Sequence, residues 1–429
     1  MKRYSKFVCQ QCAYESASWL GKCPNCGTWN SLVETMVTEG TKGTEGTKVA
    51  PQKLSEVKSL SQKRISSGFV ELDRVLGGGV VPGSVILLAG DPGIGKSTLL
   101  LQLAAKLGGL YILGEESPEQ VKIRSERLKI KGDHLLLLSQ TDVDMICTQI
   151  EEERPLLVVI DSIQTLTTSD LSGTAGTVGQ VRESAAKLAR IGKRLGVPIF
   201  LIGHVTKEGA IAGPMVLEHL VDTVLFLEGE RFYPGRTLRS FKNRFGPTDE
   251  VGVFQMKEEG LVEVKNPSEL FLWEWEKETP GSVVVPILEG TRPILVEIQA
   301  LVVPSSLAYP RRIASGFDFS RLTILAAIIS KRLGLPLSTF DVFVNIPGGL
   351  KISEPAADLG IALSIVSNFK GKALPAKSFA FGEVGLLGEV RRVLGEEKRI
   401  KEARRLGFTL PITPATVKTL TSASQRFLR

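Results

Sequence analysis

The sequence predicts an α/β fold: a mostly parallel sheet with helices on its faces, preceded by a small cysteine-rich head and followed by an α+β domain. Three observations predict it. Between about residues 62 and 265, continuous apolar runs alternate with amphipathic segments, as in parallel strands covered by helices. Four of the five cysteines lie within eighteen residues near the start. After residue 266 the pattern changes to new strand-like and helical stretches.

Length and composition limit the possible classes. The 429 residues suggest two or three domains. With 43% hydrophobic and 23% charged residues, the composition is that of a globular protein, and no apolar run reaches the roughly 18–20 residues that span a bilayer. No apolar run precedes Cys9, so we expect no secretory signal, no membrane partner and a cytoplasmic protein. The net charge of +7 suits a polyanionic partner, although many cytoplasmic proteins are equally basic.

The patterns divide the chain into four segments. Residues 1–36 are the cysteine-rich head. Residues 37–61 include the low-complexity run Thr38–Lys48, which has no apolar side chain to bury and is expected to be a flexible linker. Residues 62–265 form the α/β core, and residues 266–429 form the α+β domain, which we expect to begin at Asn266-Pro267.

The head is expected to bind zinc. It contains two CxxC pairs: Cys9, Cys12, Cys23 and Cys26. Four thiolates close a tetrahedral site and leave no open position, so the zinc would be structural and would supply folding energy that so short a segment lacks. The alternative is a group of incidental or redox thiols. Trp19 and Trp29 flank the pairs, and we expect them to pack around the metal rather than to stack on bases.

The core begins with the strand Val85–Ala89, and the helix after it should start near Gly95 and stop at Gly108-Gly109. After the next strand, Leu110–Leu113, the segment Ser117–Gln120 has the residues of an N-cap, a first-turn proline and a capping-box glutamine. Further strands are expected at Leu135–Leu138, Leu156–Ile160 and Pro198–Ile202. Two polar loops, Thr167–Thr177 and Thr206–Pro214, follow predicted strands and should lie at the carboxyl edge of the sheet, where open α/β folds bind ligands.

The segment between the first strand and its helix matches GxxxxGK[ST] in full, in the strand–loop–helix context that this motif requires. Its residues are expected to bind the phosphates of ATP: Gly90, Asp91, Pro92, Gly93, Ile94, Gly95, Lys96, Ser97 and Thr98. The glycines let backbone N–H groups face the phosphates at a helix N-terminus, which carries a partial positive charge. Lys96 would reach the β- and γ-phosphates, and the Ser97 hydroxyl would bind Mg²⁺.

Hydrolysis also needs carboxylates at this edge. Asp161 ends a buried strand and is expected to hold Mg²⁺, the alternative being a cap for the next helix. Glu115 and Glu116 follow the second strand, and we favour Glu115 as the group that orients the attacking water. The alternative for this pair is a solvated cap of the helix at Ser117. His204 follows a strand and is either a γ-phosphate sensor or an ordinary loop histidine.

The segment Lys242-Asn243-Arg244-Phe245-Gly246 resembles a motif of the RadA/Sms family of bacterial DNA repair proteins. The resemblance extends over the whole chain, through the cysteine head, Ser67–Gly79, the phosphate loop, Gly114–Ser117 and a C-terminal domain similar to that of Lon proteases. It implies a RecA-like P-loop ATPase core in a ring hexamer that processes branched recombination intermediates by branch migration. Single-stranded DNA and a RecA-type recombinase are the implied partners.

The resemblance also implies roles for particular residues. In such rings a basic residue reaches the neighbouring subunit's γ-phosphate, and Lys242 and Arg244 are the candidates. The alternative is a basic strand face in solvent. In the Lon-like domain Ala356 stands where Lon proteases have their serine nucleophile, and Glu397 matches the dyad lysine, so a peptidase is not expected.

That domain is therefore expected to be a scaffold for assembly and DNA contact. Its basic residues would contact phosphate: Arg311, Arg312, Lys331, Arg332, Arg391, Arg392, Lys398, Arg399, Lys401, Arg404 and Arg405. Interleaved acids favour a salt-bridged, solvated helix as the alternative.

Three functions follow. The first is a DNA-dependent, helicase-like ATPase, and the second is a nucleotide-switched DNA-binding assembly or loading factor with slow turnover. The third, a Lon-type peptidase, is opposed by Ala356. The sequence does not distinguish assembly into a ring from assembly into a filament.

Overall fold

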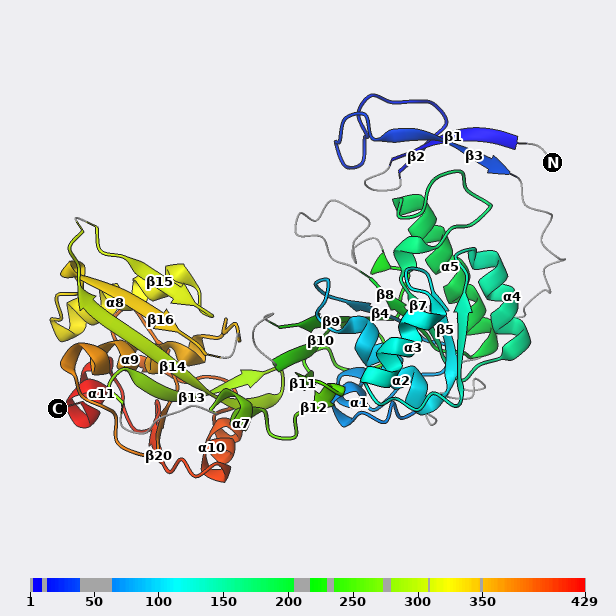
Figure 1. Cartoon of the computed structure of the whole chain (residues 1–429). Helices are drawn as coiled ribbons and strands as arrows, with labels where there is room; N and C mark the ends of the chain where they lie inside the picture. Colours follow the sequence, from blue (N-terminus) through cyan, green and yellow to red (C-terminus); the bar gives the residue numbers. More distant parts are fainter. Residues whose placement is uncertain are drawn as a thin grey trace, which may run out of the picture. The chain divides into compact units, whose positions relative to one another are not determined.

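The computed structural model describes residues 3–9, 14–38, 64–203, 217–229, 235–272, 279–307, 309–347 and 350–428 (Figure 1). By contacts the chain divides into two compact units. The first comprises Met1–Glu228 and Arg236–Glu263, and the second comprises Gly229–Gly235 and Val264–Arg429. No helix in the described part of the chain is both long and apolar enough to cross a membrane.

The head is a small antiparallel sheet in the order β2-β1-β3. Its strands are β1 (Arg3–Cys9), β2 (Glu15–Ser16) and β3 (Leu32–Thr38). Cys9, Cys23 and Leu32 form its buried centre. So small a core agrees with a segment that needs metal to fold.

The core unit contains a nine-stranded sheet in the order β12-β11-β10-β9-β4-β8-β7-β5-β6. Its six parallel strands are β4 (Val85–Ala89), β5 (Gly109–Leu113), β6 (Leu135–Ser139), β7 (Val158–Asp161), β8 (Ile199–Ile202) and β9 (Thr223–Glu228). The sheet continues with β10 (Gly235–Asn243), β11 (Val251–Lys257) and β12 (Gly260–Glu263). β10 is antiparallel to β9, and β11 is antiparallel to β12.

Helices cover both faces of this sheet (Figure 1). They are α1 (Val70–Leu76), α2 (Lys96–Leu107), α3 (Pro118–Arg127), α4 (Val143–Glu153) and α5 (Val178–Leu195). Alternate residues of β4 serve two cores: Ile86 and Leu88 pack with α1 and α2, whereas Val85 and Leu87 pack with α4 and α5. Because both faces are covered, the strand is a continuous apolar run, as the sequence indicated.

The predicted strands and the helix boundaries tested here are confirmed within one or two residues. Gly95 precedes α2 and Gly108 ends it, and the Ser117–Gln120 capping box opens α3. Cys147 is half-buried on α4, where burial raises the pKa of its thiol to about 11.

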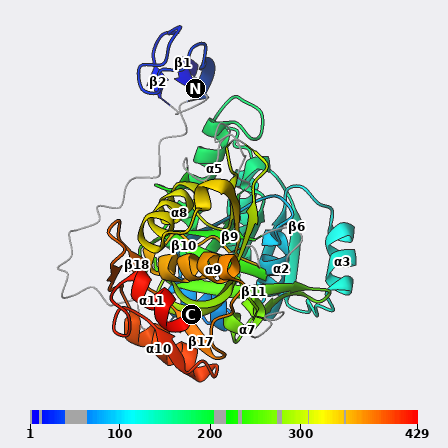
Figure 2. The same cartoon turned by 90° about the vertical axis from the view of Figure 1, so that its left-hand side faces the viewer.

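The second unit has a four-stranded sheet in the order β13-β14-β16-β15. The strands are β13 (Ser282–Glu289), β14 (Arg292–Pro304), β15 (Arg312–Ser315) and β16 (Phe340–Asn345). Its helices are α7 (Pro267–Phe271), α8 (Phe319–Leu333), α9 (Asp358–Lys370), α10 (Glu396–Arg405) and α11 (Leu420–Phe427). Two small pairs complete it: β17 (Ser378–Ala380) with β20 (Leu410–Ile412), and β18 (Glu383–Val384) with β19 (Val390–Arg391). α8 and α9 pack together in one core with the sheet (Figure 2).

Candidate nucleotide-binding site

The phosphate loop lies between β4 and α2 and has the backbone of an anion-binding turn. Gly90, Gly93 and Gly95 have φ values of +150°, +79° and +118°, a region that side chains rarely allow. A Cβ at Gly90 would also lie 2.4 Å from the Leu227 carbonyl oxygen, and one at Gly95 would lie 2.7 Å from Met256 Cε. Gly90 is therefore required by both conformation and space, and Gly95 is required by its backbone conformation.

Lys96 is the first residue of α2, and its side chain is held within the loop. Its Nζ donates to the carbonyl oxygens of Gly90 (2.9 Å) and Asp91 (3.0 Å), and the residue is 3% exposed. Burial lowers the pKa of this ammonium group, and the negative charges of Asp161, Asp91 and Glu115 oppose that shift. A buried ammonium group held among carbonyls and carboxylates is suited to phosphate oxygens.

Asp161 ends β7 and is buried beside α2. Its Oδ2 accepts a hydrogen bond of 2.7 Å from the Tyr111 hydroxyl, which also hydrogen-bonds the Ser97 side chain. Tyr111 is completely buried, and both burial and the Asp161 charge raise the pKa of its phenol. One hydroxyl thus joins the two residues expected to bind Mg²⁺, and an oxygen-only donor set of this kind fits that ion. Tyr111 was not predicted as a site residue, although its hydroxyl is the one polar side-chain group in the otherwise apolar strand Leu110–Leu113.

The two adjacent glutamates make different contacts. Glu115 Oε1 accepts a hydrogen bond of 2.5 Å from the hydroxyl of Ser162, which follows Asp161 directly. Glu116 instead forms an ion pair with Arg124 of α3. Glu115 therefore faces the phosphate loop and Asp161, whereas the charge of Glu116 is neutralised away from them.

Lys242 and Arg244 lie at the opposite edge of the sheet from the phosphate loop of the same chain. In the pairing of β10 with β9, Lys242 lies opposite Val224, and Val224 in turn lies opposite Leu87 of β4. From Lys242 the chain continues toward the start of β4. Lys242 Nζ donates to the carbonyls of Glu218 (2.5 Å) and Val221 (3.0 Å). The Arg244 N–H bonds the Asp222 carbonyl beside the start of β4, which is about 13 Å of strand from Ala89, and the contacts of Lys242 hold its ammonium group toward the same end. Both cations are therefore held away from the phosphate loop of the same chain.

The other end of β10 does reach the loop. Arg236, at the start of that strand, is buried and donates from Nε to the Ile94 carbonyl at 3.2 Å. Burial lowers the pKa of its guanidinium. No motif singled out this residue in the sequence. Its contact shows directly that β10 runs from the phosphate loop to the far edge of the sheet.

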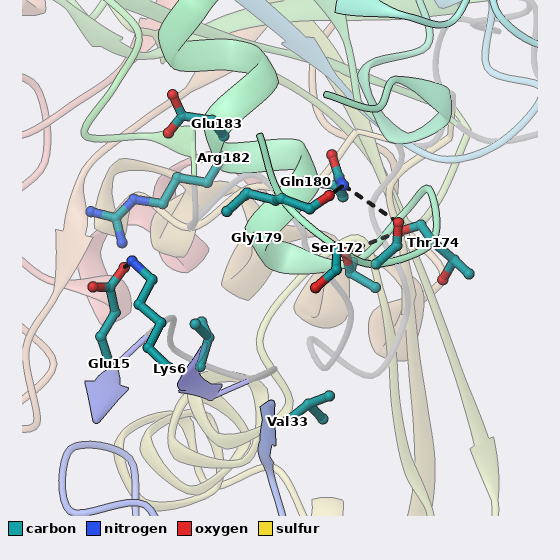
Figure 3. Close-up of a pocket in the computed structure, with 13 residues that line it drawn as sticks. Lys6, Glu15, Val33, Ser172, Thr174, Gly179, Gln180, Arg182 and Glu183 are labelled. Carbon is teal, nitrogen blue, oxygen red and sulfur yellow. Dashed lines mark hydrogen bonds and ion pairs between the residues drawn. The ribbon is translucent and has the colours of Figure 1, made fainter. Parts of the chain in front are cut away.

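The first polar loop, Thr167–Thr177, is held at its base and leads into α5. Gln180 donates to the carbonyls of Leu171 (2.8 Å) and Gly173 (3.4 Å). Figure 3 shows the Gln180 side chain beside Ser172 and Thr174 of this loop. Lys187 forms ion pairs with Asp144 and Asp170. Burial alone would raise the pKa of the Asp144 carboxyl, but its hydrogen bonds to Lys187 and Thr168 lower the pKa overall. His204 and the second polar loop, Thr206–Pro214, lie outside the described residues.

The head contains a cluster of cysteines that could bind a metal ion. The sulfur atoms of Cys9, Cys23 and Cys26 all lie within 4.8 Å of one another, and those of Cys9 and Cys26 are 3.6 Å apart. Sulfurs around tetrahedral zinc are separated by about 3.8 Å, given Zn–S bonds of about 2.3 Å, so the cluster fits this ion. Cys12 lies outside the described residues.

The prediction that Trp19 and Trp29 pack around the metal is wrong. Trp19 is 54% exposed and Trp29 is 69% exposed, whereas Leu20 and Phe7 pack against the cysteines. The smaller apolar side chains are sufficient for so small a core.

Three of the basic residues predicted to contact phosphate in the second unit are paired with acidic residues. Arg399 is 1% exposed and makes a bidentate ion pair with Glu354, with a further bond to the Pro286 carbonyl. It therefore cannot contact DNA from the surface, and its inclusion in that set is wrong. Arg391 and Arg405 pair with Glu389 and Glu402, as the salt-bridged alternative proposed.

Two family models and one solved structure match parts of the chain. The family described as "AAA domain" matches residues 51–210, and the "Rubredoxin metal binding domain" family matches residues 7–34. A KaiC-like protein of Pyrococcus horikoshii matches 47% of this chain and 99% of its own, with 20% identity and a TM-score of 0.39.

Curated relatives match almost the whole chain. "DNA repair protein RadA" of Halalkalibacterium halodurans is 51% identical over 424 residues, which are 96% of this chain and 93% of the relative. The protein of the same name from Bacillus subtilis is 50% identical over 426 residues, with the same coverage. The chain therefore belongs to the RadA family of DNA repair proteins, with a P-loop ATPase core and an N-terminal zinc ribbon.

Proposed function

We propose that this chain is a DNA-dependent ATPase that works as a ring, a homohexamer by resemblance, and processes branched recombination intermediates by branch migration on single-stranded DNA. A RecA-type recombinase is the expected partner. In this proposal each ATP is bound by the loop Gly90–Thr98 of one subunit, and its γ-phosphate is contacted by Lys242 and Arg244 of the next.

One observation supports the proposal: the phosphate loop and the segment with Lys242 and Arg244 lie toward opposite ends of the strands of one sheet. Lys96, Asp161 and Glu115 gather at the carboxyl edge, while Arg244 follows the far end of β10, with its N–H bonded to the Asp222 carbonyl. A heterologous, head-to-tail arrangement of copies brings such halves together and closes into a ring when the rotation allows.

The proposed chemistry assigns a task to each group. Lys96 and the loop amides hold the triphosphate, and Mg²⁺ bound by Ser97 and Asp161 would neutralise charge on its oxygens. Glu115 orients the attacking water. The neighbour's Lys242 and Arg244 stabilise charge that develops on the γ-phosphoryl oxygens. The polar loop Thr167–Thr177 is a candidate for the DNA contact, because it follows the carboxyl end of β7 and is fixed at its base.

The test is steady-state ATP hydrolysis with and without single-stranded DNA, in zinc-loaded protein of verified folding. We expect DNA to stimulate turnover and Lys96→Ala to abolish it. Hydrolysis that is indifferent to DNA would support the alternative, a loading factor that uses nucleotide as an assembly switch. A Lon-type peptidase is not proposed, since Ala356 cannot act as a nucleophile.

A further inference from the structure

The zinc ribbon exposes two tryptophans next to a lysine and a glycine. We call Trp19, Gly21, Lys22 and Trp29 the tryptophan surface. The exposed fractions of Trp19 and Trp29, 54% and 69%, are large for the largest aromatic side chain, in a segment that has few apolar side chains. Exposed aromatic groups of this size commonly mark a binding surface.

The backbone fixes these residues relative to one another. Lys22 and Trp29 form an antiparallel bridge, and the Asn30 N–H donates to the Gly21 carbonyl at 2.7 Å. A Cβ placed on Gly21 would lie 3.5 Å from Cη2 of Trp19 and 3.9 Å from Cζ3 of Trp29. The edges of both rings therefore meet over a residue that has no side chain of its own.

The charge next to the rings is positive. Lys22 Nζ lies 5.6 Å from the centroid of the Trp29 ring, within the range of a cation–π contact. Among the described residues no carboxylate pairs with Lys22, whereas Lys6 is paired with Glu15 at 2.7 Å. The head as a whole carries four basic and two acidic residues up to position 36. A ligand for this surface should be flat, aromatic and anionic.

We propose that the tryptophan surface binds single-stranded nucleic acid, with unpaired bases stacked on Trp19 and Trp29 and a phosphate next to Lys22. Base–aromatic stacking tolerates any sequence because every base has a π-face, and a nearby cation supplies the backbone contact. The choice of nucleic acid over an apolar peptide rests on the unpaired Lys22 and on the proposed action of this protein on single-stranded DNA.

The experiment uses the full-length, zinc-loaded chain and a thymidine oligomer carrying 5-iodo-deoxyuridine. Photocrosslinked residues are identified by mass spectrometry, and affinity is measured by fluorescence anisotropy without nucleotide. We expect crosslinks to Trp19 or Trp29. The double variant Trp19→Ala/Trp29→Ala should bind about 5-fold or more weakly, since stacking contributes about 1–3 kcal/mol per base. Tyr309→Ala, which removes another highly exposed aromatic ring, is the matched control and should not change affinity.

A second variant separates loss of the surface from loss of the fold. Gly21 is not among the residues with positive φ, so Gly21→Val is compatible with its backbone while filling the space between the rings. It should weaken binding with unchanged zinc content, and Trp19→Phe should retain most of the affinity. If the double variant and Gly21→Val both bound the oligomer with wild-type affinity, and no crosslink to Trp19 or Trp29 formed, the inference would be overturned while the proposed function stood. The same would follow if these variants kept their affinity for DNA but no longer bound a recombinase. No binding of the oligomer by the wild-type chain would overturn the proposed function as well.

Discussion

Adjacent residues at the end of β5 show how contacts separate similar side chains. Glu115 hydrogen-bonds Ser162 next to Asp161, whereas Glu116 is paired with Arg124. The bond to Ser162 holds Glu115 beside Asp161 at the carboxyl edge of the sheet, whereas Arg124, the partner of Glu116, lies on α3. Glu115 therefore remains the predicted group for orienting the attacking water.

Glu115→Gln should therefore lower the turnover number for ATP by about 100-fold or more while nucleotide binding persists, because the amide cannot accept a proton from water. Glu116→Gln should retain turnover within about threefold, since it removes only an ion pair that is partly exposed to solvent. Hydrolysis rates and the affinity of a fluorescent ATP analogue, measured on both variants, check this. Equal losses in the two variants would contradict the assignment.

The shifted pKa of Lys96 gives a prediction for pH. Burial lowers this pKa in the nucleotide-free protein, and bound phosphates would raise it again by favouring the charged form. ATP affinity should thus be greatest below the pKa of the free protein and should weaken as the pH rises through that pKa. Calorimetric titrations from neutral to alkaline pH measure this, with Lys96→Arg as the control that keeps its charge. An ATP affinity that stays constant or increases over this pH range would contradict the predicted dependence on the charge of Lys96.

At the scale of elements, strand β10 connects the two edges of the sheet. Its first residues reach the phosphate loop through Arg236, and its last residue precedes Arg244. Asp222 fastens this far end. Its carboxylate is 3% exposed, accepts from the Val85 N–H at 3.1 Å, and lies 3.3 Å from the Arg244 guanidinium and 3.4 Å from Lys193. The same carboxylate therefore holds both Arg244 and the start of β4.

Asp222→Asn should keep the bond to Val85 and lose the charge that orients Arg244. Because Arg244 is half-exposed, the loss is about 1 kcal/mol, and turnover should fall about 3- to 5-fold with little change in the KM for ATP. Steady-state kinetics at matched protein concentration provide the measurement. A change confined to KM would assign Asp222 to ground-state binding instead.

A buried ion pair gives the corresponding prediction in the second unit. Glu354→Ala would leave the Arg399 guanidinium buried without its partner, which costs about 3–5 kcal/mol. Hydrogen exchange in α9 should report this loss of stability. Replacing both partners by apolar residues (Glu354→Leu with Arg399→Met) should recover most of it, and Glu389→Ala, at a pair whose partner Arg391 is exposed, should cost much less. A small loss for Glu354→Ala would contradict the account.

The local pattern of the sequence predicted the elements well but not their register. The strands β4 to β8, the start of α2 and the capping box of α3 follow from side-chain periodicity and end signals, which are local. The position of Lys242 opposite Val224 depends on antiparallel pairing with β9, which no local pattern encodes. Tyr111, Arg236 and the Arg399–Glu354 pair were missed for the same reason, since their partners are distant in sequence. The tryptophans were misplaced because an apolar ring was assumed to be buried.

At the scale of the whole molecule, the account predicts that one copy cannot complete its own ATPase site. The loop Gly90–Thr98 and the cations Lys242 and Arg244 belong to opposite edges of one sheet. Hydrolysis is then a property of an interface between copies, and its rate should depend on protein concentration below the concentration at which the ring assembles.

Mixing two inactive variants tests this central claim most directly. Lys96→Ala lacks the ammonium that binds phosphate but keeps Arg244, and Arg244→Ala has the reverse defect. Each alone should be nearly inactive. Co-assembled in equal amounts, they should regain activity at roughly a quarter of the interfaces if subunits mix at random. A mixture no more active than the mean of its two components, in rings shown to contain both, would mean that the two residues do not act across an interface between subunits, and would contradict the account.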